Sequence, residues 1–146
     1  MPEAIEDFWP EEISEAKKVT VPSLIAVQQA ALLGKRTKNV VTATVISLEG
    51  REPGRLVFGF NLVAPALSNY RLRLFNFNYR LDQLYPVVVY NFGVRGFKEP
   101  LQADDEKAWK ELLKIIFSSP GVVSAIQALR AQSEDVASKS EDEIPF

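Results

Sequence analysis

Apolar and polar residues alternate most regularly between residues 55 and 92. Leu56, Phe58, Phe60 and Leu62 recur at every second position, a period that indicates a half-buried β-strand. Turn residues separate this run from its neighbours, and strands joined by short turns pair antiparallel in the simplest topology. The four expected strands are residues 39–48, 55–63, 70–81 and 87–92.

Helical spacing appears on both sides of these strands. A first helix is expected at Ser23–Leu33, because Pro22 is tolerated in a first turn and Gly34 is a typical residue just past a helix end. Two more helices are expected after the acidic residues 104–106 and at Ser119-Pro120. The expected buried stripe of the first helix is Leu24, Val27, Ala31 and Leu32.

The sequence therefore predicts an α+β fold, with an N-terminal helix, a four-stranded antiparallel meander, two C-terminal helices and a disordered acidic tail. Residues 1–19 are expected to form an acidic arm, and residues 20–132 a single domain. Residues 133–146 are too polar to bury a core and are expected to be disordered.

Composition narrows the possible chemistry. The chain of 146 residues has no histidine and no cysteine, which excludes Ser-His and Cys-His nucleophiles and the common zinc sites. We therefore expect no enzymatic activity, no catalytic residues, no bound metal and no cofactor. No apolar run approaches the length of a membrane span, so no membrane association is expected. We expect a cytoplasmic protein associated with the nucleoid.

Charge is segregated along the chain although the net charge is only −2. Residues 1–16 carry six acids and no base. Residues 17–98 carry twelve Lys and Arg against three acids, and residues 99–146 carry ten acids against five bases. A basic middle between acidic ends indicates a polyanionic partner.

The longest strand-like run, residues 70–81, permits two registers. Strict alternation places Arg71 and Arg73 on one face with Phe75, Phe77 and Tyr79, and such a mixture of cations and rings can stack on bases. A β-bulge at Leu74-Phe75 would instead send the rings to the core and leave a polar, basic outer face. Both registers expose the two arginines. The candidate nucleic-acid contacts are Arg71, Arg73, Arg80, Lys35, Arg36, Lys38, Arg55, Tyr70, Phe75, Phe77 and Tyr79.

The last residues carry a second signal. Ile144-Pro145-Phe146 follows the acidic run Glu141, Asp142 and Glu143. This ending resembles the C-terminal tip of bacterial single-stranded DNA-binding proteins (SSB), which recruits genome-maintenance proteins. By this resemblance, Pro145 and Phe146 would anchor the tip in an apolar pocket while the acids meet a basic surface. The resemblance does not extend to the body, which lacks the element order of the family's OB-fold.

Together these patterns predict a single-stranded DNA-binding protein on a scaffold other than the OB-fold, serving DNA replication and repair. It would coat DNA with its basic and aromatic sheet face and recruit partners through its tip, and the expected assembly is a homodimer. The alternative is a protein-interaction or assembly module without specific nucleic-acid activity.

Overall fold

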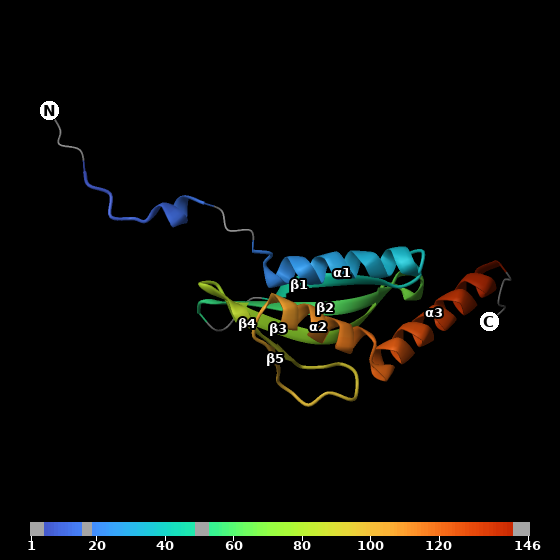
Figure 1. Cartoon of the computed structure of the whole chain (residues 1–146). Helices are drawn as coiled ribbons and strands as arrows, with labels where there is room; N and C mark the ends of the chain where they lie inside the picture. Colours follow the sequence, from blue (N-terminus) through green and yellow to red (C-terminus); the bar gives the residue numbers. More distant parts are fainter. Residues whose placement is uncertain (1–4, 16–18, 49–52, 142–146) are drawn as a thin grey trace.

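The computed structural model describes residues 5–15, 19–48 and 53–141 of the chain (Figure 1). A short 3-10 turn at Glu11–Ser14 lies in the N-terminal arm, and another at Pro65–Leu67 follows the second strand. The remaining elements, in chain order, are α1 (Pro22–Arg36), β1 (Thr42–Leu48), β2 (Arg55–Ala64), β3 (Tyr70–Arg80), β4 (Gln83–Tyr90), β5 (Leu101–Ala103), α2 (Glu106–Phe117) and α3 (Pro120–Glu141).

The five strands form one antiparallel sheet in sequential order from β1 to β5. The α+β class and the meander are thus confirmed, and each of the four predicted strands is present. The fifth strand was not predicted. β5 pairs with Val87–Val89 of β4, and its three residues are too few to display a period of two.

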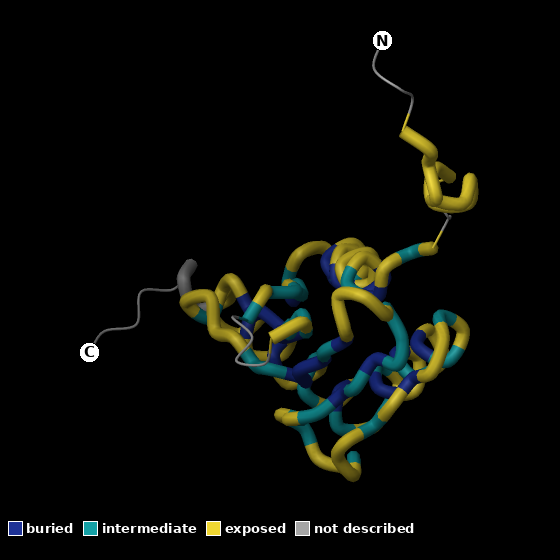
Figure 2. Tube along the Cα trace, turned by 90° about the vertical axis from the view of Figure 1, so that its left-hand side faces the viewer, coloured by how far each residue is buried: buried dark blue, intermediate teal, exposed yellow. Residues whose placement is uncertain are grey.

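Helices α1 and α2 pack on the same face of the sheet. Phe77 of β3 lies 5.2 Å, between ring centroids, from Trp109 of α2, and the Tyr79 hydroxyl donates a hydrogen bond to Ser23 Oγ of α1 at 2.9 Å. Figure 2 shows the buried residues gathered inside the body, with exposed residues around them. The core consequently lies between this face and the helices.

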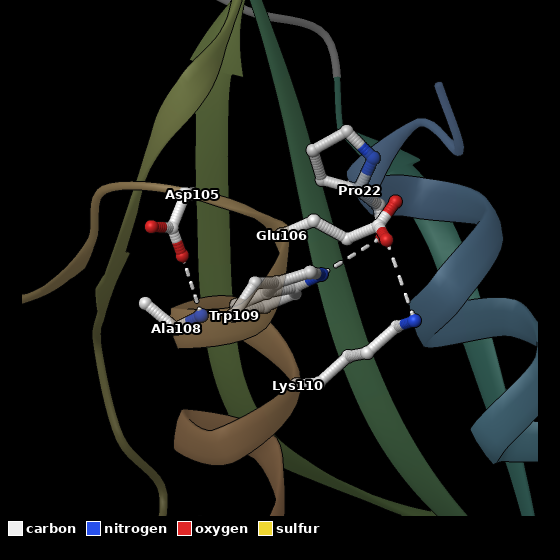
Figure 3. A network of polar contacts seen from close by, with 6 residues as sticks. All are labelled: Pro22, Asp105, Glu106, Ala108, Trp109 and Lys110. Atoms are coloured by element: carbon white, nitrogen blue, oxygen red, sulfur yellow. Dashed lines mark hydrogen bonds and ion pairs between the residues drawn. The ribbon is translucent and has the colours of Figure 1, made fainter. Parts of the chain in front are cut away.

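The start of α2 is fixed by polar contacts (Figure 3). Asp105 caps the helix, because its carboxylate accepts a hydrogen bond from the Ala108 backbone N–H at 2.7 Å. One turn later, the buried Trp109 ring donates its Nε1–H to the Pro22 carbonyl oxygen at 3.1 Å. This bond joins the first turn of α2 to the first turn of α1 and sets the spacing of the two helices over the sheet.

The predicted buried stripe of α1 is wrong. Leu24, Val27 and Leu32 are exposed, as is Ala31, whereas the buried positions are Pro22, Ile25 and three small residues. Those small residues are spaced four apart and allow the helix to lie close to β1; a Cβ added at Gly34 would come within 3.0 Å of Asn39 Oδ1. The three small residues are Ala26, Ala30 and Gly34. Gly34 does not end the helix as predicted, because α1 continues two residues further to Arg36.

The end of the ordered chain also differs from the prediction. Helix α3 continues past Gln132 to Glu141, so the predicted disorder of residues 133–141 is corrected. Ser133 is buried one turn beyond the buried Leu129, which extends the packed face of the helix. Arg130 and Glu134 add an exposed i,i+4 ion pair at 3.7 Å.

Among the described helices, no single one is both long and apolar enough to cross a bilayer. One pair of these helices, α2 and residues 120–138 of α3, reaches the length and apolar composition of a membrane span when the two are counted together. The two helices are bent by 54° relative to each other.

Candidate nucleic-acid interface

A β-bulge decides which face each side chain of β3 occupies. Phe60 of β2 lies opposite Phe75, and the next β2 residue, Asn61, lies opposite Arg73, so Leu74 has no partner in the pairing. The bulge considered at Leu74-Phe75 is therefore present. Because of this extra residue, both Leu74 and Phe75 are buried on the side of the helices.

The aromatic part of the predicted interface is wrong as a result. Phe75, Phe77 and Tyr79 are buried in the core and cannot stack on bases. Their rings pack instead against Phe58 and Phe60 of β2, at centroid distances of 5.2 to 5.9 Å. Tyr70 is half exposed at the beginning of β3, but it lies opposite the buried Ala64 on the side of the helices and so does not join the arginines of β3 either.

The opposite side of β2 and β3 points away from α1 and α2 and is called the arginine face. On it, Arg71 and Arg80 are exposed, and Arg55 and Arg73 are half-buried. From Arg71 to Arg80, strand geometry gives a track about 30 Å long. The residues of the arginine face are Arg55, Val57, Gly59, Asn61 and Val63 of β2, and Arg71, Arg73, Asn76, Asn78 and Arg80 of β3.

Arg73 lies flat at the centre of the arginine face. Its Nε–H donates to Asn61 Oδ1, and its Nη1 donates to Asn76 Oδ1 at 2.7 Å. The guanidinium passes directly over Gly59, where an added Cβ would lie 2.6 Å from Arg73 Cζ. Glycine therefore makes room for the cation, and two buried amide side chains fix its orientation.

A second cationic group lies at one end of the face. Arg55 and Arg80 are directly opposite each other across β2 and β3, a placement of like charges that disfavours folding. Arg55 Nη1 donates to Asn78 Oδ1 at 2.8 Å, and Arg80 Nη2 forms an exposed ion pair with Asp82 at 2.8 Å. Both arginines line a shallow hollow of about 460 Å³, and an anion in this hollow would offset their repulsion.

The charge of the sheet has one sign. None of the five strands contains aspartate or glutamate, whereas β2 and β3 contain four arginines. Asp82 belongs to the turn between β3 and β4 and reaches only the Arg80 end of the track. The arginine face consequently presents donors and positive charge, which is the chemistry that phosphate oxygens require.

The structure divides the predicted cations into two groups. Lys35, Arg36 and Lys38 are exposed at the C-terminal end of α1, in the helical layer. Arg36 lines a groove on the side of the core, together with Phe60 and Lys114. These three residues therefore do not join the arginine face.

The predicted partner-binding tip is described only at its beginning. Glu141 is the last residue of α3. Asp142, Glu143, Ile144, Pro145 and Phe146 lie outside the described residues.

Sequence reasoning missed three residues of this site. Gly59 and Asn61 support Arg73, and their only signal was their shared position on the polar side of the β2 pattern. Tyr90 of β4 pairs with Asn76 and so lies on the same side of the sheet as the arginine face, half-buried. It is the one aromatic side chain of the five strands that the pairing puts there; it lay within the expected strand 87–92, but that nearly continuous apolar run did not show which face it takes.

Within the described residues, no group of three or more acidic, histidine or cysteine side chains gathers to hold a metal. Comparisons of the chain with models of protein families, with curated proteins and with solved structures find no match. A functional interpretation therefore rests on the arrangement of the chain's own residues.

Proposed function

We propose that this protein binds single-stranded DNA across the arginine face and recruits other proteins through its acidic C-terminal residues. The observation that carries the proposal is the arginine track on β2 and β3, in a sheet whose strands contain no acidic residue. This set of side chains supports a role in binding.

The exposed and the half-buried arginines would contact different parts of the nucleic acid. Arg71 and Arg80, exposed near opposite ends of β3, would neutralise phosphates along the strand. Arg73 uses two of its five N–H donors on asparagines, and its fixed plane leaves the others for a phosphate or a base edge. Stacking would fall to Tyr90, in place of the buried phenylalanines.

A single strand fits this surface better than a duplex does. Its bases are unpaired, so their hydrogen-bonding edges and ring faces can meet the side chains of a sheet. A duplex would offer a sheet face mainly its phosphates. The expected binding mode is therefore dominated by backbone contacts, with weak base preference.

The recruitment half of the proposal rests on the resemblance of residues 141–146 to the SSB tip. Its chemistry is an apolar anchor, Ile144-Pro145-Phe146, preceded by three acids. A partner would need an apolar pocket with a basic rim.

The test is a titration of fluorescent oligo-dT and of a matched duplex, followed by anisotropy at several salt concentrations. We expect tighter binding to oligo-dT, weakening as salt increases. Replacing Arg71 and Arg80 together by alanine should weaken binding at least tenfold. Each lost phosphate contact should reduce the slope of log K against log salt by about 0.7.

Lys107→Ala is the matched control, because Lys107 is an exposed cation on α2 in the other layer. It should leave both affinity and salt slope nearly unchanged. Equal losses in the control and in the Arg71/Arg80 variant would refute the assignment to the arginine face. Absence of binding to either ligand at low salt would favour the alternative, a protein-interaction module, for which the exposed apolar side chains of α1 are the supporting observation.

A further inference from the structure

Helix α1 presents an apolar surface that the described part of the chain leaves uncovered. Leu24 and Val27 are each 46% exposed, and Ala31 continues the same stripe one turn further. Between Pro22 and Gly34 the helix contains no charged residue at all. A surface helix normally carries charge on its outer side, so this one has the character of an interface.

A groove lies beside the C-terminal half of α1. It has a volume of about 490 Å³, within the range of ligand-binding pockets, and its floor is formed by Phe60 and Leu62 of the sheet. Leu32 extends from α1 to its edge, and the cations Arg36 and Lys114 lie on its rim. The groove therefore fits an apolar or aromatic side chain that is flanked by acids.

The N-terminal arm has this complementary chemistry. Phe8 and Trp9 are 87% and 73% exposed, and Figure 2 shows the described arm exposed along its length. Asp7 precedes the two rings and accepts a hydrogen bond from the Trp9 backbone N–H at 2.9 Å. Glu11 and Glu12 follow directly. Exposed rings on a short arm contribute nothing to its own folding, which indicates that they bind elsewhere.

We propose that two copies of this chain pair through the outer surfaces of α1, antiparallel, and that each places its N-terminal arm in the groove of the other. An uncharged helix surface is best covered by another uncharged surface, and a two-fold axis supplies the same one. The antiparallel arrangement also separates the two cationic ends, Lys35-Arg36, and aligns the helix dipoles favourably.

Chain length agrees with this exchange. In the antiparallel pair, the partner's arm leaves its helix beside this copy's Arg36, at the groove. From Val21 back to Trp9 the chain has twelve residues and reaches up to about 40 Å. The whole of α1 is only about 21 Å long, so the arm passes the end of the helix and delivers its rings with length to spare. The acids of the arm then lie near Arg36 and Lys114.

The first test is sedimentation equilibrium of the full chain over a range of concentrations. We expect a species of twice the 16.4 kDa chain mass. Leu24→Glu with Val27→Glu should weaken dimerisation at least tenfold, because it places two charged side chains from each copy in the apolar contact. Ile115→Glu, at a 60% exposed apolar position on α2, is the matched control and should leave dimerisation unchanged. Circular dichroism verifies that each variant is folded.

The second test follows Trp9 by acrylamide quenching of its fluorescence. Trp109 is fully buried and resists quenching, so the quenchable signal belongs to Trp9. Trp9 should be protected in the dimer and quenchable in the Leu24/Val27 variant. A chain that is monomeric at all concentrations overturns the proposal, as does a dimer that resists the two glutamates. Protection of Trp9 in the monomer overturns the exchange and assigns the groove to the chain's own arm. None of these readings depends on DNA, so they stand apart from the test of the arginine face.

Discussion

The two faces of the same strands differ in almost every respect. Towards the helices, β2 and β3 present five aromatic rings in contact with one another: Phe58, Phe60, Phe75, Phe77 and Tyr79. Away from the helices, they present four arginines and three asparagines, and the asparagines accept hydrogen bonds from Arg55 and Arg73. Within one strand, the residues on one side thus pack in the core, and their neighbours on the other side make that face positively charged.

The difference depends on a single extra residue in β3. Without the bulge, strict alternation would put Phe75, Phe77 and Tyr79 beside Arg71 and Arg73. With Leu74 unpaired, the rings move to the core, and Asn76 and Asn78 take their places on the arginine face. The bulge therefore removes the rings from the arginine face and leaves it with guanidinium and amide groups.

The largest effect is expected from the helix-covered face. Phe77 is fully buried and touches Phe58 and Trp109, so Phe77→Ala should lower the free energy of unfolding by about 3–5 kcal/mol. Urea denaturation measures this loss. DNA affinity per folded molecule should remain the same, because the ring does not reach the arginine face. A matched change at exposed Ile115, to alanine, should cost less than about 0.5 kcal/mol. A cost below 1 kcal/mol for Phe77→Ala would place its ring outside the core.

A smaller effect is expected on the arginine face at Gly59. In Gly59→Ala the new Cβ collides with the Arg73 guanidinium and separates it from Asn61 and Asn76. Leaving these buried amides without their donor should cost about 1–3 kcal/mol. Affinity for oligo-dT should also fall towards that of Arg73→Ala, because the cation loses its fixed position.

A double-mutant cycle separates this effect from backbone strain. Once Arg73 is alanine, the collision is gone, and Gly59→Ala should change stability by less than about 0.5 kcal/mol. An equal cost with and without Arg73 would mean that Gly59 is needed by the strand itself rather than by the arginine.

Periodicity was sufficient to predict the class of fold because most elements here are long. The strands of seven to eleven residues and the twelve-residue helix α2 each repeat their apolar pattern several times. β5, with three residues, repeats nothing and was missed. In α1 the apolar pattern was read correctly as a stripe but assigned to the wrong side, since Ala26, Ala30 and Gly34 favour close packing on the sheet although larger residues were available.

The candidate site was predictable only for its exposed cations. Arg71 and Arg73 point outwards in either register, so no knowledge of the bulge was needed to select them. The aromatics depended on the register, which is decided by pairing with β2 and is not visible in β3 alone. The separation of Lys35 from the arginine face likewise follows from which side of the sheet α1 covers, a tertiary property without a local signal.

The smallest effect is expected at Tyr85, on the helix-covered side of β4. Burial of its hydroxyl raises the pKa of Tyr85 to about 12, with the carboxylates of Glu106 and Asp105 adding to the shift. In the unfolded chain this pKa is near 10, so the folded protein holds the proton more tightly between these two values. Its contribution to stability is therefore complete below pH 10 and is lost as the pH rises towards 12.

Tyr85→Phe, which cannot ionise, should lose less stability over this interval when urea unfolding is measured at stepwise pH. At pH 7 it should be no less stable than the wild type, because among the described residues the hydroxyl has no hydrogen-bond partner to lose. A parallel loss in the wild type and in Tyr85→Phe would show that the Tyr85 hydroxyl is open to solvent.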